Sequence, residues 1–103
     1  MRTMVKVQLK MLPWIASMLN KQSSGWFILE KEIAEGTTIG DLLVDLAFSH
    51  TGFRKVVFNP DAGKIGDQII IFLNDSHLQD SDAAIAKLND GDIITLVHVY
   101  AGG

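Results

Sequence analysis

The chain has 103 residues, of which 48% are hydrophobic and 20% charged, and its formal net charge is −3. This length and composition fit one domain with a single core and exclude an intrinsically disordered chain. The sequence contains no cysteine, which excludes disulfides, thiolate metal sites and cysteine nucleophiles. Any sulfur chemistry must therefore use sulfur that comes from another molecule.

No signal peptide and no apolar stretch long enough to span a bilayer is evident, so we expect a cytoplasmic protein without a membrane partner. The charge is unevenly placed. Residues 1–60 hold seven Lys and Arg against five Asp and Glu, whereas residues 61–103 hold two against seven. The acidic C-terminal part argues against a nucleic-acid partner, and it fits either a basic partner or a solvated acidic face.

Two strands joined by a long connection are predicted first. Residues 4–10 alternate between apolar and polar side chains, and residues 26–33 resume this β character, so the two segments are expected to pair antiparallel. Residues 11–25 form an insertion, too long for a tight hairpin, with a short helical segment entered through Pro13. It is expected to fold over a sheet edge.

Two tryptophans, Trp14 and Trp26, are the expected anchors of this insertion. Large aromatic side chains commonly pack a long loop against a core. A platform for a ligand is the alternative interpretation, and it is the less favoured one.

The clearest helix is predicted to begin after Thr38, a suitable N-cap residue, with Asp41 in its first turn. Apolar residues from Ile39 onward recur at helical spacing, so one face of the helix should be buried. Gly52 is expected to end the helix as its C′ residue. His50, in the last turn, is better explained by the helix end than by catalysis.

The last third alternates turns and strands, which together with the preceding helix indicates an α+β fold. Residues 53–58 show no clear pattern. The predicted elements that follow are a turn at residues 59–63, a strand at residues 68–73, a helical turn at residues 82–88, and a final strand after the Asp90-Gly91 turn.

Strand alternation predicts an apolar surface on the side of the sheet away from the helix. It would contain Ile70 and Phe72 from one strand and Val97 and Val99 from the last. An uncovered apolar sheet face marks a partner surface. The alternative is that residues 11–22 cover it.

The sequence ends in Ala101-Gly102-Gly103. Because glycines pack no side chain, we expect residues 99–103 to form a thin, mobile strip that ends in a carboxylate and needs no processing. Such a strip fits a narrow channel in which an activating enzyme joins the carboxylate to the α-phosphate of ATP. A frayed end or an expression scar is the alternative for a terminal Gly-Gly alone.

Several short segments of the last third occur together in one known family. They are Phe72-Leu73-Asn74-Asp75, then Leu88-Asn89-Asp90-Gly91-Asp92, an apolar strand, and the terminal Gly102-Gly103. In this combination the chain resembles the ubiquitin-like sulfur carriers of the MoaD/ThiS family. The resemblance extends over most of the chain, from Val5 to Gly103.

The resemblance implies a β-grasp fold in a single domain over residues 1–103. In this fold, one main helix packs on a mixed sheet of four to five strands, the first and last strands lie side by side, and a Gly-Gly tail projects. The residues expected to contact partner enzymes are Ile70, Phe72, Val97, Val99, Tyr100 and Ala101.

The resemblance also implies a function. A ubiquitin-activating-type adenylyltransferase would use ATP to adenylate Gly103, which follows Gly102, and a sulfur donor would convert the adenylate to a thiocarboxylate. An acceptor enzyme such as the molybdopterin synthase large subunit would then take the sulfur. The carrier itself would bind no cofactor and no metal, and it would act as a co-substrate or small subunit rather than as a stand-alone catalyst.

Molybdopterin synthesis is the expected pathway, with cysteine or thiazole synthesis as the alternative. The insertion at residues 11–25, His98, Tyr100 and the loop at residues 59–66 depart from the compact members of the family. A ubiquitin-like protein modifier and a non-catalytic β-grasp binding module also remain open. A conventional enzyme is disfavoured, because the three histidines lack metal-ligand spacing and no nucleophile motif is present.

Overall fold

The computed structural model describes residues 3–98. Within this range the strands are β1 (Met4–Met11), β2 (Phe27–Ala34), β3 (Phe58–Asn59), β4 (Lys64–Ile65), β5 (Ile69–Leu73), β6 (Ser76–Leu78) and β7 (Ile93–His98). The helices are α1 (Pro13–Ser17), α2 (Ile39–Ser49), α3 (Thr51–Val56) and α4 (Asp80–Ile85).

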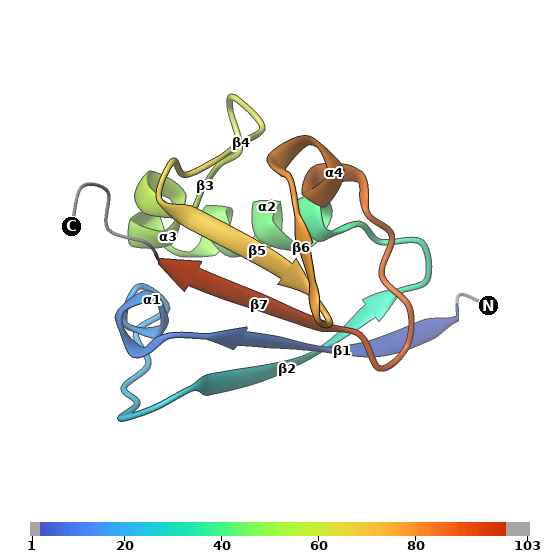
Figure 1. Ribbon diagram of the computed structural model, residues 1–103, viewed down its shortest axis with the longest axis horizontal. Coiled ribbons are helices and arrows are strands. Elements are labelled where there is room, and N and C mark those ends of the chain that lie inside the picture. Colours follow the sequence, from blue (N-terminus) through green and yellow to red (C-terminus); the bar gives the residue numbers. More distant parts are fainter. Residues whose placement is uncertain (1–2, 99–103) are drawn as a thin grey trace.

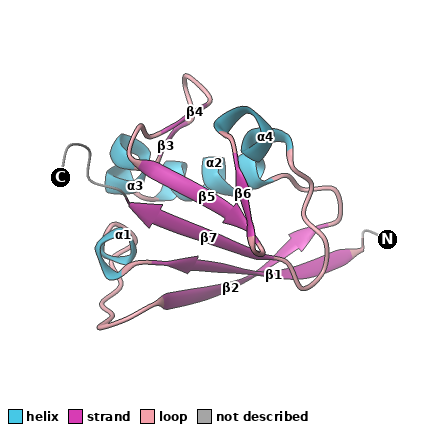
Figure 2. Ribbon diagram, viewed as in Figure 1, coloured by secondary structure: helices cyan, strands magenta, loops and turns pink. Residues whose placement is uncertain are grey.

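One mixed sheet organises the fold, with its strands in the order β2-β1-β7-β5-β6 (Figure 1). β1 and β7 lie side by side and are parallel, whereas the other neighbouring pairs are antiparallel. β3 and β4 form a separate small hairpin. Figure 2 shows the helices α2, α3 and α4 together on one side of the sheet. This is the α+β, β-grasp arrangement predicted from the sequence.

The core lies between the sheet and α2. On the sheet, Leu9 of β1 lies opposite Ile94 of β7, and both side chains are fully buried. The apolar stripe predicted for the helix is confirmed, because its buried residues are Ile39, Leu42, Leu43, Leu46 and Ala47.

The predicted N-cap of α2 is also confirmed, and it is a full capping box. Thr38 Oγ1 accepts a hydrogen bond from the Asp41 backbone N–H (3.0 Å), and Asp41 Oδ2 accepts one from the Thr38 backbone N–H (3.1 Å). Two backbone donors that have no partner within the helix are thereby satisfied. The start of α2 is fixed by its own sequence.

The prediction that Gly52 ends this helix is wrong. α2 ends at Ser49, His50 is extended (φ −138°), and the chain enters α3, which contains Gly52. The reason is packing: the second helix buries Phe53 completely, and a Cβ on Gly52 would contact Met18 of the insertion at 3.6 Å. The unassigned segment after Gly52 is therefore mostly helical.

The insertion contains the predicted helical segment, with Pro13 in the first turn of α1. Its anchors are not the tryptophans, however. Ile15, Ala16 and Leu19 are buried and belong to the core, whereas Trp14 is 44% exposed and Trp26 is 49% exposed. Small and medium apolar residues fill the space at the end of the sheet, and the larger indoles remain at the surface.

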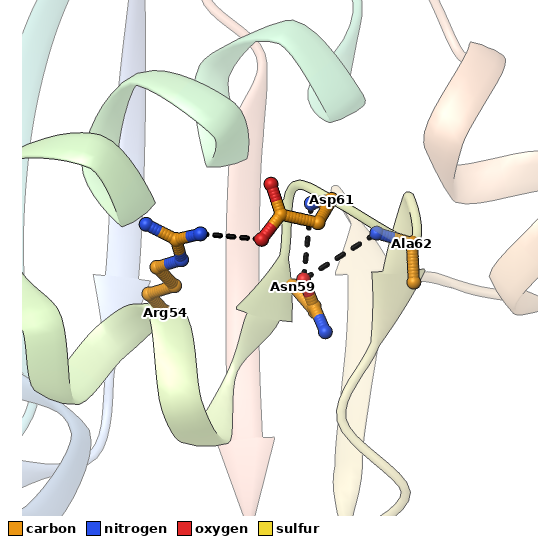
Figure 3. Close-up of polar contacts among 4 residues, drawn as sticks. All are labelled: Arg54, Asn59, Asp61 and Ala62. Carbon is orange, nitrogen blue, oxygen red and sulfur yellow. Dashed lines mark hydrogen bonds and ion pairs between the residues drawn. The ribbon is translucent and has the colours of Figure 1, made fainter.

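The turn predicted at residues 59–63 joins β3 to β4. Asn59 Oδ1 accepts hydrogen bonds from the backbone N–H groups of Asp61 (3.0 Å) and Ala62 (3.4 Å), and Arg54 of α3 forms an ion pair with Asp61 (Figure 3). Gly63 closes the turn with φ +63°. The hairpin is thus tied to α3 by a side-chain contact.

The remaining differences lie between β5 and β7. The helical turn expected at residues 82–88 begins earlier, as α4 at Asp80. β6 was not predicted: after Asn74 (φ +55°) the chain turns back and pairs antiparallel with β5. A strand of three residues is too short to show an alternating pattern.

The connection between β4 and β5 passes very close to α3 at Gly66. A Cβ at this position would lie well inside the contact distance of the Val56 carbonyl oxygen, whereas one at Gly25 would meet no atom within 4 Å. We expect Gly66→Ala to lower the free energy of unfolding by about 2 kcal/mol, because the backbone must move to admit the methyl group. Gly25→Ala, the matched control, should change it by less than about 0.5 kcal/mol. Urea unfolding followed by tryptophan fluorescence measures both, and equal stabilities would contradict this close approach.

Candidate functional site

The strand that precedes the tail is one of the most firmly held parts of the molecule. β7 is paired on one side with β1 and on the other with β5, and its Ile94 and Leu96 are fully buried. The strand ends at His98, and we call this end of the sheet the tail exit. The predicted site residues beyond it lie outside the described residues: Val99, Tyr100, Ala101, Gly102 and Gly103.

Two side chains from distant parts of the sequence contact His98 at the tail exit. His98 Nε2 donates a hydrogen bond to Gln68 Oε1 (2.9 Å), just ahead of β5. The ring of Trp14 packs on the imidazole, with 4.3 Å between ring centroids and 47° between ring planes. Figure 1 shows α1 at the end of the sheet where β7 ends. The sequence pattern had not linked these three residues, because they come from three separate segments.

The described part of the predicted partner surface is Ile70, Phe72 and Val97, which we call the outer face. Ile70 lies opposite Val97 in the sheet, and all three side chains are partly exposed. They point away from α2, because their neighbours along the strands, such as Ile71 and Leu96, are buried in the core. α1 instead buries its apolar side chains in that core.

The carboxylates that precede β7 organise a turn rather than a charged surface at the tail exit. Asp90 Oδ1 accepts from the Lys6 backbone N–H (2.8 Å), and Asp92 accepts from the Asn89 backbone N–H (2.8 Å) and from Asn74 Nδ2 (3.2 Å). This turn lies at the start of β7, about 20 Å along the strand from its end. Asp90 and Asp92, two carboxylates of the acidic C-terminal part, therefore lie away from the tail exit.

A groove of mixed charge opens beside the tail exit. It lies between α3 and the β3–β4 hairpin, has a volume of about 480 Å³, and includes Arg54, Lys55, Lys64, Asp67 and Gln68 in its lining. Arg54 is paired with Asp61 and Lys64 with Asp67. Gln68 is the residue that hydrogen-bonds to His98. The charge beside the tail exit is therefore mixed, and the basic partner expected from the sequence stays a prediction.

The three histidines are dispersed, as their sequence spacing indicates: His50 lies between α2 and α3, His77 lies in β6, and His98 ends β7. Between residues 3 and 98, no three side chains of the kinds that bind metals gather into a possible site. In the same range, no helix has the length and apolar character to cross a bilayer.

Comparison with known proteins agrees with this geometry. The sequence profile of the ThiS family matches residues 21–103. The sulfur carrier protein CysO of Mycobacterium tuberculosis is 30% identical over 71 residues, which cover 68% of this chain and 76% of CysO.

Solved structures share the fold at lower identity. SAMP1 from Haloferax volcanii superposes with a TM-score of 0.70 at 20% identity, covering 95% of this chain and 99% of that one. A Pyrococcus furiosus protein, described as a candidate molybdopterin converting factor, subunit 1, gives 0.66 at 20% identity, covering 93% and 99%. The profile match and the identity to CysO establish the family, and these two structures agree in fold. The chain therefore belongs to the ThiS family, the ubiquitin-like sulfur carriers of the ThiS/MoaD type.

Proposed function

We propose that this sulfur carrier works through a thiocarboxylate at Gly103. The observation that supports the proposal is the position of β7, a central, doubly paired strand that is followed in the sequence by Val99, Tyr100 and the terminal Ala-Gly-Gly. A doubly paired strand followed by a short segment whose last two residues have no side chains suits the presentation of a terminal carboxylate to a narrow enzyme channel. Because the chain has no cysteine, no thiol of its own competes with the carboxylate as the sulfur-bearing group.

The proposed reaction has two steps, both on a partner enzyme of the ubiquitin-activating type. A carboxylate oxygen of Gly103 attacks the α-phosphorus of ATP, and pyrophosphate leaves, which gives an acyl adenylate. Hydrosulfide then attacks the acyl carbon, and AMP leaves with the bridging oxygen. One sulfur has replaced one oxygen, and since the donor is sulfide, no electrons are transferred.

The acceptor we propose is an enzyme of cysteine synthesis that uses the thiocarboxylate as its sulfur nucleophile. The match to CysO supports this pathway at 30% identity over 71 residues, whereas the likeness to the molybdopterin-related protein is one of fold at 20% identity. The loop at residues 59–66, where the chain departs from the compact members of the family, supports the same choice. This proposal therefore places cysteine synthesis ahead of molybdopterin synthesis, the reverse of the order expected from the sequence alone.

Intact mass spectrometry tests the chemistry. After incubation with ATP, magnesium, sulfide and the activating enzyme of its host, the protein should gain the mass of one sulfur-for-oxygen exchange. A variant without Gly103 should unfold at the same Tm, because the core ends with β7, and should gain no mass. Normal adenylation of this variant would refute the role of Gly103. An unchanged wild-type mass, with an enzyme shown to be active on another carrier, would favour a binding module.

The product in the cell separates a sulfur carrier from a protein modifier. A carrier gives free thiocarboxylate, whereas a modifier gives amide conjugates to lysine side chains. Immunoblots of the host under non-reducing and reducing conditions should therefore show the unconjugated chain. A ladder of conjugates that depends on Gly103 would replace the carrier proposal with the modifier.

We also propose that the outer face contacts the partner enzymes. Its side chains are apolar and partly exposed, and Val97 lies on the strand that leads to the tail, so an enzyme that receives the tail lies against this face. Val99, Tyr100 and Ala101 would continue the contact. The ring of Phe72, whose centroid is 5.6 Å from that of His77, is the largest apolar group of the outer face.

Phe72→Ala should raise the KM of the activating or acceptor enzyme for the carrier about tenfold, because a large aromatic group at an interface contributes strongly to binding. Its Tm should change little, since the ring is not in the core. Phe48→Ala is the matched control: Phe48 is 67% exposed on α2, on the other side of the sheet, and the change should alter KM less than about twofold. Equal kinetics for the two variants with both enzymes would contradict a contact at the outer face.

A further inference from the structure

The insertion after β1 reaches the tail exit. α1 begins two residues after the end of β1, and its Ile15 and Ala16 are fully buried, so the position of the helix is fixed by the core. Trp14, one residue earlier, is directed to the end of β7, where its ring packs on His98. The insertion thus places an aromatic side chain against the last described residue before the tail.

His98 makes a second side-chain contact on the side of β5. His98 lies opposite Ile69 in the β5–β7 pairing, and Gln68, immediately before Ile69, accepts a hydrogen bond from His98 Nε2 at 2.9 Å. His98 is therefore held by backbone pairing and, through its side chain, between Trp14 and Gln68. Strand ends without such contacts fray.

We propose that Trp14 and Gln68 are positioning residues for the C-terminal tail. They hold His98 so that the tail leaves the sheet at a fixed point and in a fixed direction. This inference rests on the proposed function, in which the Gly103 carboxylate must reach the α-phosphate of ATP. Residues 99–103 span at most about 17 Å when extended, so a shift of their starting point changes where the carboxylate arrives.

The energetic reason is conformational entropy. An enzyme that binds a strand end already held in place does not have to order that residue, and binding is stronger by the entropy that is not lost. The effect belongs to binding rather than to the chemical step, because the groups that react are the same. Loss of the contacts that Trp14 and Gln68 make with His98 should therefore raise the KM for the carrier and leave kcat nearly unchanged.

The contact between Trp14 and His98 is separable from folding. Trp14 is 44% exposed, and α1 is anchored by its neighbours, so loss of the indole should leave the fold intact. Trp26 offers a matched control, since it is 49% exposed and flanks the same insertion. Its ring contacts Lys10 Nζ, at 4.7 Å from the ring centroid, and no contact with His98 is found among the described residues.

The experiment compares Trp14→Ala, Trp14→Phe, Gln68→Ala and Trp26→Ala in the full chain. ATP–pyrophosphate exchange with the host's activating enzyme gives kcat and KM for each carrier. Trp14→Ala and Gln68→Ala should raise KM about five- to tenfold with kcat within twofold, Trp14→Phe should restore part of the loss, and Trp26→Ala should behave as the wild type.

Amide hydrogen exchange supplies a readout that needs no enzyme. Exchange at Val97 and His98 should accelerate about tenfold in Trp14→Ala and stay unchanged in Trp26→Ala, while Ile94 and Leu96 should keep their rates in both. If Trp14→Ala fails to fold, Trp14→Phe and Gln68→Ala are measured in its place.

The outcomes separate this inference from the proposed function. Wild-type kinetics and exchange in Trp14→Ala and Gln68→Ala would overturn it. A raised KM without faster exchange would also overturn it, because Trp14 would then contact the enzyme directly instead of positioning the tail. If the wild type is not activated at all, the proposed function fails, and faster exchange in Trp14→Ala would still establish the positioning role of Trp14.

Discussion

The parallel pairing of β1 with β7 is the constraint on which the rest of the structure depends. Strands at the two ends of the chain can be parallel neighbours only if everything between them crosses from one end of the sheet to the other. β2 and β5 each bring the chain back to the end of the sheet where β7 starts, and α2 runs between them in the opposite direction, where its buried stripe closes the core. The same pairing brings the end of β1 to the end of β7, so whatever follows β1 in the sequence lies beside the tail.

That geometry explains why an insertion far from the C-terminus in sequence contacts it in space. Residues 11–25 leave β1 at the tail exit, and α1 reaches His98 within three residues of the strand end. The side chains of β7 point to both faces of the sheet, because successive residues of a strand alternate. Ile94 and Leu96 lie in the core, and Val97 lies on the outer face. A single strand thereby joins the core, the outer face and the tail.

The features that could be predicted from the sequence are those encoded locally. The capping box at Thr38, the stripe along α2, the alternation of β1 and the turn after Asn59 each depend on residues a few positions apart, and each is present. The features that were missed depend on distant neighbours. Gly52 lies inside a helix because Phe53 is buried against the rest of the core, and no local pattern reports that packing.

The candidate site divides in the same way. Alternation correctly placed Ile70, Phe72 and Val97 on one side of the sheet, because a strand's period is a local property. The contacts of Trp14 and Gln68 with His98 join three segments, so they became visible only in the folded chain. Charge counted along the sequence does not give its position in the fold, since Asp90 and Asp92 are used by a turn at the far end of β7.

That turn gives the motif Asp90-Gly91-Asp92 a physical meaning. Asp90 and Gly91 exchange hydrogen bonds with the backbone of Lys6 in β1, at 2.8 Å each, and Gly91 adopts φ +86°, a conformation that favours glycine. The motif therefore fixes the start of the last strand against the first, at the end of β7 opposite the tail exit. A relative that keeps this motif but has lost the final glycines would build the same sheet and lack the terminus that the proposed reaction uses. Sequence searches should accordingly treat the Asp-Gly-Asp turn as a marker of the scaffold and the terminus as the marker of the proposed activity.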